Sequence, residues 1–400
     1  MKVADTHDEV LKVTDGSARR PVLVVDSVVV GEDPAQQGLE AACCSAVQKA
    51  IHFAFPKVRD TMTILWDLLT SSSPSDFLLR LPQGAYTVAR TCREGRSVVS
   101  LAFHECRLLQ TLNVLGNNSF ENSFSESSAQ FVSGRGKRYT FLRERIRASL
   151  KAALNARLLH HSLYYGNHAN SGEALLLIYI PSVEANDDKL PITRVCTDGS
   201  IPPKYLPVFV RCSELRPPSI EHGLAAPGPV DIEFHLGRPR SKAYVKYSSW
   251  VWERESFECR KERPQSAELV IVSNENDELV ILEGLTSNIF FFYTEGFLAT
   301  ASKDILCGHM RELVLKASVA HGIPVRLDHP PCIAEYKSWS EVFLVSATRL
   351  LSPVRSIWVG RSLGKAQELW KSANPPSLFA DRLRAWTIEQ MHLAAESVLD

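Results

Sequence analysis

Three features in the second half of the sequence have the chemistry to bind an aldehyde cofactor: Lys246, Glu283 and the helix start after Gly308. A lysine amine can form a Schiff base with an aldehyde. An acid such as Glu283, placed between the apolar runs 279–282 and 289–292, can keep a pyridine nitrogen protonated so that the ring accepts electrons. Free backbone N–H groups at a helix start can hold a phosphate. Together these are the three parts that pyridoxal phosphate requires.

Each of these residues also has a plainer interpretation when taken alone. Lys246 is then a solvated surface lysine, with Lys242 as a rival nearby. Glu283 is then a turn residue beside Gly284, and Arg107 a charge on a helix surface. A buried carboxylate, however, is costly without a compensating charge. On the cofactor interpretation, the cation that compensates Glu283 is the pyridinium, which the chain does not encode.

The spacing of motifs along the chain carries a family resemblance. The motifs are Glu283-Gly-x-x-x-Asn288-Ile-Phe, Leu298-x-Thr300 and Leu306-x-Gly308-x-x-Arg311, preceded in the N-terminal half by Gly84-Ala-Tyr-Thr-Val-Ala-Arg90 and Phe103-His-Glu-Cys-Arg107-Leu. This set resembles the class IV aminotransferases, the fold-type IV pyridoxal phosphate enzymes, which include branched-chain aminotransferases, D-amino acid aminotransferases and aminodeoxychorismate lyases. The run Lys-Tyr-Ser-x-Trp-Val at 246–251 is most similar to the divergent D-amino acid aminotransferase-like branch. The resemblance covers roughly residues 80–355.

The resemblance implies a role for each matching residue. Lys246 would form the Schiff base and move the proton between the substrate Cα and the cofactor. Glu283 would pair with the pyridine nitrogen. Arg107 would bind the phosphate, because its guanidinium fork suits phosphate oxygens. The backbone of His309 and Met310 would cap the same phosphate at the helix start.

Three further residues have implied supporting roles, and two positions depart from the family pattern. Asn288 would support the turn beside the ring. A phosphate-binding threonine of the family aligns with Ala347, so Ser346 or Thr348 would take its place. Branched-chain enzymes have a tyrosine five residues after the lysine, where this sequence has Val251. These departures bear on the substrate and on catalytic competence.

Three functions are consistent with these residues. The first is an aminotransferase that moves an amino group between an amino acid and a 2-oxo acid through Lys246. The second is a lyase of the aminodeoxychorismate type, which uses the same lysine to eliminate pyruvate. The third is a non-catalytic scaffold or regulatory protein that retains the fold. The resemblance also implies a homodimer with sites near the subunit interface.

Composition places the chain among globular proteins. Of its 400 residues, 45% are hydrophobic and 22% charged, and the 45 basic residues balance the 45 acidic ones. This balance argues against nucleic acid as a partner. The nine cysteines are scattered without a Cys-x-x-Cys pair, which disfavours a disulfide framework or a metal site. The polar N-terminus and the lack of an apolar run of about 20 residues favour a cytosolic protein that does not enter the membrane.

The order of predicted elements indicates an α/β or α+β class. Strands are predicted at 21–30, 84–92, 97–103, 173–180, 268–273, 278–282, 287–293, 297–300, 324–327, 341–345 and 354–359. Helices are predicted within 38–69, broken at Pro56, and at 104–115, 139–158, 250–262, 309–320, 366–370 and 378–399. The resemblance implies the two-domain fold-type IV architecture.

Five segments divide the chain on this interpretation. They are an N-terminal strand with a helical insertion at 1–80, a small α/β domain at 81–201, a proline-rich interdomain connection at 202–239, a larger cofactor-binding domain at 240–360 and C-terminal helices at 361–400. A loop rich in Ser, Asn and Gly is expected at 117–136.

Overall fold

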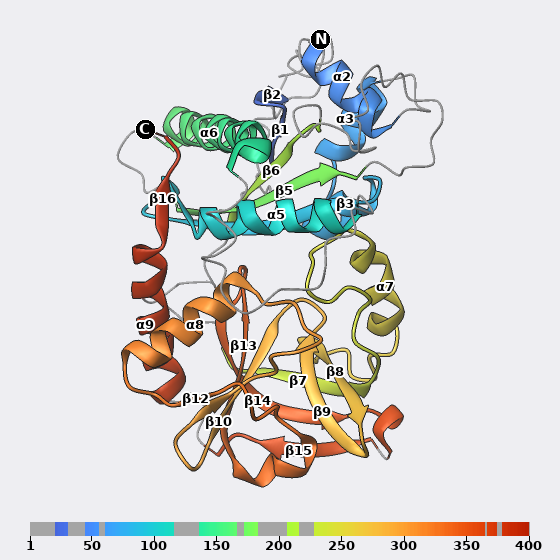
Figure 1. Cartoon of the computed structure of the whole chain (residues 1–400), viewed down its shortest axis with the longest axis vertical. Coiled ribbons are helices and arrows are strands. Elements are labelled where there is room, and N and C mark those ends of the chain that lie inside the picture. The colour runs from blue at the N-terminus through green and yellow to red at the C-terminus, as the bar shows by residue number, and fades with distance from the viewer. Residues whose placement is uncertain are drawn as a thin grey trace, which may run out of the picture.

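Two curled β-sheets with helices around them form the molecule (Figure 1). A computed structural model describes residues 21–30, 45–55, 61–115, 136–165, 172–182, 206–215, 228–364, 366–373 and 378–399. The predicted loop at 117–136 and the first 20 residues lie outside these ranges, apart from Gly136. Within them, no helix has the length and apolar character needed to cross a bilayer.

The first sheet is antiparallel throughout the described residues. Its strand order is β16 (Ala395–Ser397), β4 (Ser97–Val99), β3 (Gly84–Cys92), β5 (Glu173–Pro181), β6 (Phe209–Leu215), β1 (Val22–Val25) and β2 (Val28–Val30). Five helices accompany it: α2 (Ser45–Ala54), α3 (Thr61–Leu69), α4 (Pro74–Leu79), α5 (Leu101–Leu115) and α6 (Gly136–Tyr165).

Both faces of this sheet are buried, which explains the continuous apolar run in β5. Side chains alternate between faces along a strand. Leu176 and Ile178 pack in one core cluster with side chains of α5 and α6. Leu177 and Tyr179 pack on the other face, with side chains of α2, α3 and α4. A strand covered on both sides gains from apolar residues at every position.

The second sheet is mixed. Its order is β12 (Val325–Arg326), β11 (Leu298–Ala299), β10 (Asn288–Tyr293), β13 (Trp339–Ser346), β14 (Leu350–Val359), β7 (Val230–Leu236), β8 (Glu268–Glu275) and β9 (Glu278–Gly284), with β15 (Gln367–Lys371) paired to β14. The remaining elements are α7 (Ser249–Glu258), α8 (His309–Ala320), α9 (Leu378–Leu393) and the short helices η2 (Ile333–Ser338) and η3 (Arg361–Leu363). Strand pairs β7–β8, β7–β14 and β11–β12 are parallel.

The C-terminal part of the chain joins the two sheets. α9 packs beside α8 and against β14 of the second sheet (Figure 1). The chain then continues into β16, which pairs with β4 at the edge of the first sheet. The predicted helix at 378–399 is therefore wrong beyond Leu393, because strand pairing replaces it.

Two other predictions of secondary structure are also wrong. The strand expected at 97–103 ends at Val99, because Ser100 has a left-handed backbone (φ 54°) and Leu101 begins α5. The helix expected at 366–370 is the strand β15, which is fixed by pairing with β14 and by burial of Trp370.

The range 202–239, predicted as a connection, contains the strands β6 and β7. Its prolines flank these two strands and do not interrupt them, so both can pair fully. The mixed class of helices and sheets predicted from the sequence is confirmed. The other predicted helices and strands in the described ranges are found near their expected bounds.

Candidate active site

All eight predicted site residues line one cavity of about 250 Å³. The cavity is lined by strands of both sheets, β3 and β5 of the first and β9 of the second, and also by α4, α7 and the start of α8. The predicted residues in the lining are Arg107, Lys246, Glu283, Asn288, His309, Met310, Ser346 and Thr348. Residues from distant parts of the sequence therefore meet at one site.

Lys246 is positioned by hydrogen bonds of its own backbone. Its carbonyl accepts from the N–H of Tyr86 at 3.1 Å, and its N–H donates to Oγ1 of Thr111 at 3.2 Å. Tyr247 pairs with Ala85 of β3 in a short antiparallel bridge, and the Ser248 N–H donates to the Gly84 carbonyl. Backbone anchoring on both sides leaves the lysine side chain directed along the cavity wall, with Nζ 4.9 Å from the centre of the Tyr86 ring.

The surroundings of Lys246 favour a neutral amine. Burial lowers the pKa of Lys246 well below its ordinary value, and the positive charges of Arg107, Arg240 and Arg254 lower it further. Glu283 acts in the opposite direction but more weakly. A neutral amine at neutral pH is a nucleophile and a base, whereas an exposed lysine is protonated there.

Glu283 lies at the end of β9 and has a cationic partner within the chain. Its Oε1 is 3.1 Å from Nε of Arg240 in a buried ion pair, and its Oε2 accepts from the N–H of Leu306 at 3.0 Å. The expectation that only a bound cofactor supplies the cation is therefore wrong. Burial raises the pKa of Glu283 to about 7, opposed by Arg240 and by the Leu306 N–H.

Asn288 holds the turn that leads into α8. Its Nδ2 donates to the Leu306 carbonyl at 2.8 Å, and its Oδ1 accepts from the N–H of Gly308 at 3.2 Å. A Cβ at position 308 would lie only 2.5 Å from Oδ1 of Asn288, so this close approach requires glycine. The amide thus fixes the chain that leads to the free N–H groups at the start of α8.

Arg107 projects from α5 toward the same turn. Its Nη2 donates to the carbonyl of Cys307, and its guanidinium lies 4.5 Å from the centre of the Phe103 ring. Burial lowers the pKa of Arg107 to about 10, so it remains a cation at neutral pH. The only partner oxygen found for it in the described residues is a neutral carbonyl, which leaves its charge available to an anion.

Two neutral histidines lie behind this turn. The rings of His104 and His309 are 4.5 Å apart, and Nδ1 of His104 shares a 2.7 Å hydrogen bond with Oγ1 of Thr87. Burial lowers the pKa of both histidines, and the positive charge of Arg107 adds to this effect. Their Nε2 atoms have no hydrogen-bond partner among the described residues.

Ser346 and Thr348 lie on either side of Ala347 at the end of β13. Their hydroxyl oxygens are 3.1 Å apart, and Oγ of Ser346 also accepts from the N–H of Arg349 at 3.2 Å. All three residues line the cavity, and the Ala347 carbonyl accepts from Arg90. Which of the two hydroxyls would contact a phosphate stays a prediction.

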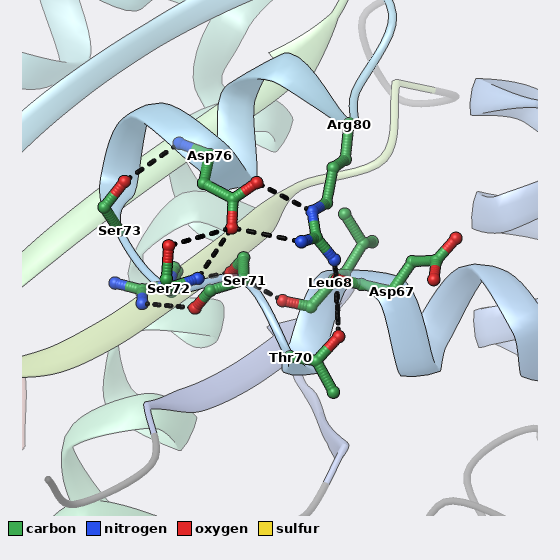
Figure 2. Close-up of polar contacts among 9 residues, drawn as sticks. Asp67, Leu68, Thr70, Ser71, Ser72, Ser73, Asp76 and Arg80 are labelled. Atoms are coloured by element: carbon green, nitrogen blue, oxygen red, sulfur yellow. Dashed lines mark hydrogen bonds and ion pairs between the residues drawn. The ribbon is translucent and has the colours of Figure 1, made fainter.

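The position where branched-chain enzymes have a tyrosine belongs to an apolar wall. Val251 is buried in one cluster with Leu78, Tyr86 and Leu177, drawn from α4, β3, β5 and α7. The α4 part of this wall is held by the polar loop before it (Figure 2). There the Ser73 hydroxyl accepts from the N–H of Asp76 at 3.0 Å, while the Asp76 carboxylate accepts from the Ser72 N–H and from Arg80.

Sequence reasoning missed three cavity residues: Arg240, Arg254 and Tyr86. Arg240 had a signal, since it stands six residues before Lys246 in the run Arg238-Pro-Arg240. Arg254 had a weaker one, because it follows Trp250 and Val251 by one helical turn on α7. The position of Tyr86 next to Lys246 depends on pairing between distant segments and has no local signal.

Comparison with a family model identifies the second half of this site. Residues 258–357 match the model described as amino-transferase class IV, a range that includes Glu283, Asn288, His309 and Met310. This part of the chain is therefore similar to the class IV aminotransferase family. The resemblance predicted from the motifs is confirmed at the level of the family, whereas the D-amino acid branch stays a prediction. No curated protein matches the chain.

Solved structures of class IV aminotransferases share the fold. A branched-chain amino acid aminotransferase from T.th. with pyridoxamine 5'-phosphate aligns with a TM-score of 0.52 and 13% identity, over 79% of this chain and 90% of that one. A branched-chain aminotransferase from Thermoproteus uzoniensis with norvaline gives 0.51 and 14% identity, over 79% and 90% of the two chains. At this identity the likeness establishes the fold.

Proposed function

We propose that this protein is a pyridoxal phosphate-dependent aminotransferase that moves an amino group between an amino acid and a 2-oxo acid. The observation that carries the proposal is the convergence of the Lys246 amine, the Glu283 carboxylate and the start of α8 on one cavity. Two similar structures support it by their contents, since the T.th. enzyme was solved with pyridoxamine 5'-phosphate and with N-(5'-phosphopyridoxyl)-L-glutamate.

The residues of the cavity fit this cofactor. Pyridoxal phosphate supplies an aldehyde that amines attack and a ring that withdraws electrons from the substrate Cα. Glu283 would accept the N–H of the pyridinium, and Arg107 would bind the phosphate together with the N–H groups of His309 and Met310. The positive charge of Arg107 and the open N–H groups of a helix start suit a dianionic group.

Lys246 would carry out the proton transfers of the reaction. Its amine would hold the cofactor through the aldehyde that the cofactor supplies, until a substrate amine takes its place. It would then be free to accept the proton from the substrate Cα and to return it. Arg240 contributes indirectly, because it opposes protonation of Glu283 and so keeps that carboxylate able to accept a hydrogen bond.

The first test is covalent trapping of the cofactor. After incubation with pyridoxal phosphate and reduction with borohydride, peptide mass spectrometry should find a pyridoxyl group on Lys246. Lys246→Ala should abolish the adduct. Lys242→Ala is the matched control, because Lys242 is four residues away, exposed and outside the cavity lining. This control should label as the wild type does, and labelling spread over both lysines would contradict the proposal.

A second assay separates transfer from elimination. Loaded protein that consumes an amino donor only when a 2-oxo acid is supplied, without release of pyruvate, is a transferase. Pyruvate release from aminodeoxychorismate would instead identify the lyase. Protein that cannot be loaded with pyridoxal phosphate would contradict both enzyme functions. The non-catalytic scaffold or regulatory protein would then be the remaining hypothesis. The homodimer expected from the resemblance stays a prediction, which sedimentation of the purified protein tests.

A further inference from the structure

One wall of the cavity carries a single charged side chain among the described residues. The wall consists of residues from α4, β3, β5 and α7, and its lining members are Pro74, Ser75, Leu78, Tyr86, Val88, Leu175, Leu177, Trp250, Val251 and Arg254. On α7, Arg254 follows Trp250 by four positions and Val251 by three, so all three share one helical face. Arg254 is thus a cation set in a mostly apolar surface.

The charges in the cavity lining do not balance. The described lining residues include four basic side chains, Arg107, Arg240, Lys246 and Arg254, but one acidic side chain, Glu283. Glu283 is paired with Arg240, and burial together with the neighbouring arginines lowers the pKa of Lys246 and so disfavours its charged form. On the proposed function the cofactor phosphate meets Arg107. The charge of Arg254 is then the one that remains for the substrate.

The contacts of Arg254 leave it able to bind an anion. Its side chain is 12% exposed, and its Nε is 3.2 Å from Oε1 of Glu258, an (i, i+4) partner that is 52% exposed and outside the cavity lining. A pair with such an exposed partner contributes about 0–1 kcal/mol, so another carboxylate can compete with it. Nη2 donates to Oγ of Ser75, which also lines the cavity and keeps its own proton to donate.

Arg254 also lies within electrostatic range of the reacting lysine. Its positive charge lowers the pKa of Lys246 and that of Tyr86, the residue whose ring is 4.9 Å from Nζ of Lys246. Because Arg254 and Lys246 line the same cavity, a molecule whose carboxylate is bound at Arg254 can extend toward the amine of Lys246.

We propose that Arg254, with Ser75 beside it, binds a carboxylate of the substrate and thereby selects carboxylic acids over simple amines. This inference rests on the proposed function, because it takes Arg107 to be occupied by the cofactor phosphate. The carboxylate can be the one on the reacting carbon or a second one on the substrate side chain. In the apolar surroundings of Val251 and Leu177, a charge-assisted hydrogen bond from Arg254 is stronger than in water.

The test uses inert acids as probes, so that binding is measured without turnover. Protein loaded with pyridoxal phosphate is titrated calorimetrically with isovalerate, glutarate and the neutral amide isovaleramide. Arg254→Gln should weaken binding of isovalerate or glutarate by at least about tenfold, and Arg254→Lys should restore part of it. The matched control is Arg260→Gln, since Arg260 is an exposed cation two residues after α7 and outside the cavity lining. Isovaleramide binding should not depend on any of these variants.

The variant Glu258→Gln should change binding of the acids in the direction opposite to Arg254→Gln, and it does so at an exposed position. Removing the competing carboxylate should tighten probe binding by about two- to fivefold. If Arg254→Gln loses binding of both isovalerate and glutarate, Arg254 binds the carboxylate on the reacting carbon. If it loses binding of glutarate alone, Arg254 binds the carboxylate of the substrate side chain. Acid binding that is unchanged in both Arg254→Gln and Glu258→Gln would overturn the inference.

Failure of this inference can be told apart from failure of the proposed function. Borohydride should still label Lys246 in Arg254→Gln, because burial, and not the charge of Arg254, is the main cause of the lowered pKa of Lys246. Wild-type protein that takes up no pyridoxal phosphate refutes the function itself. Wild-type protein that takes up the cofactor but shows no dependence of acid binding on Arg254 refutes the inference alone.

Discussion

Replacing Arg240 with methionine tests how a buried glutamate stays ionised at this site. The two side chains are only 4% and 7% exposed, and their charged atoms are 3.1 Å apart. Coulomb's law at an effective dielectric constant of about 20 gives an attraction of about 5 kcal/mol. Removing one member of a buried pair typically costs about 3–5 kcal/mol. The carboxyl group can avoid part of this cost by taking up a proton.

The cost of Arg240→Met should therefore depend on pH. Burial raises the pKa of Glu283 from 4.5 to about 7, so the wild-type protein loses stability as pH rises through this window and no more above it. Without Arg240 this pKa rises further, and the variant continues to lose about 1.4 kcal/mol per pH unit above pH 7. The stability gap between the two proteins should be larger at about pH 9 than at about pH 6.

The assay is urea denaturation of the cofactor-free proteins at both pH values, followed by circular dichroism. The contact of Arg240 with the Trp250 ring is lost at both pH values, so it does not alter the difference between them. Lys316→Met is the control, because Lys316 and Glu312 form an exposed (i, i+4) pair worth less than about 1 kcal/mol. A gap that stays the same at both pH values, or that does not exceed the control, would refute the reasoning.

Two smaller predictions concern backbone positions and use the same denaturation assay. Gly308→Ala places a Cβ 2.5 Å from Oδ1 of Asn288 and should lower stability by about 1–3 kcal/mol, whereas Gly228→Ala, with nothing within 4 Å, should cost less than about 1 kcal/mol. Equal losses in the two variants would contradict the close-approach argument. Ser73→Ala removes the oxygen that accepts the N–H of Asp76 at the start of α4 and should cost about 1 kcal/mol. An unchanged midpoint would mean that this cap contributes nothing.

The fold was predictable where local pattern and tertiary environment agree. The helix at α8 and the strands β8 to β10 have clear periodicity and were placed nearly at their bounds. Errors occurred where pairing partners lie far away in the sequence. β16 is helical by local propensity but pairs with β4, some 300 residues earlier, and β15 exists because β14 presents an open edge.

The motif residues of the candidate site were predictable from the sequence, whereas the ion pair of Glu283 was not. The eight motif residues line one cavity because their spacing reflects the turn between Asn288 and α8 and the bridge between Lys246 and β3. Sequence reasoning left Glu283 without a partner in the chain. Its actual partner, Arg240, lies 43 residues away and meets it only through the packing of the second sheet and the segment before α7. Ion pairs between distant segments leave no periodic signal.

Two groups of lining residues give the cavity two kinds of surface. Glu283 and Arg240 form a polar wall whose charges balance before any ligand binds. The wall around Val251 and Leu177 is mostly apolar apart from Arg254 and Ser75, so it can accept the apolar part of a ligand without leaving polar groups unpaired. Lys246 lines the same cavity, and burial lowers its pKa well below the ordinary value. Because desolvation is the largest cause and each arginine a smaller one, single substitutions of the surrounding arginines should leave the pKa of Lys246 below its ordinary value.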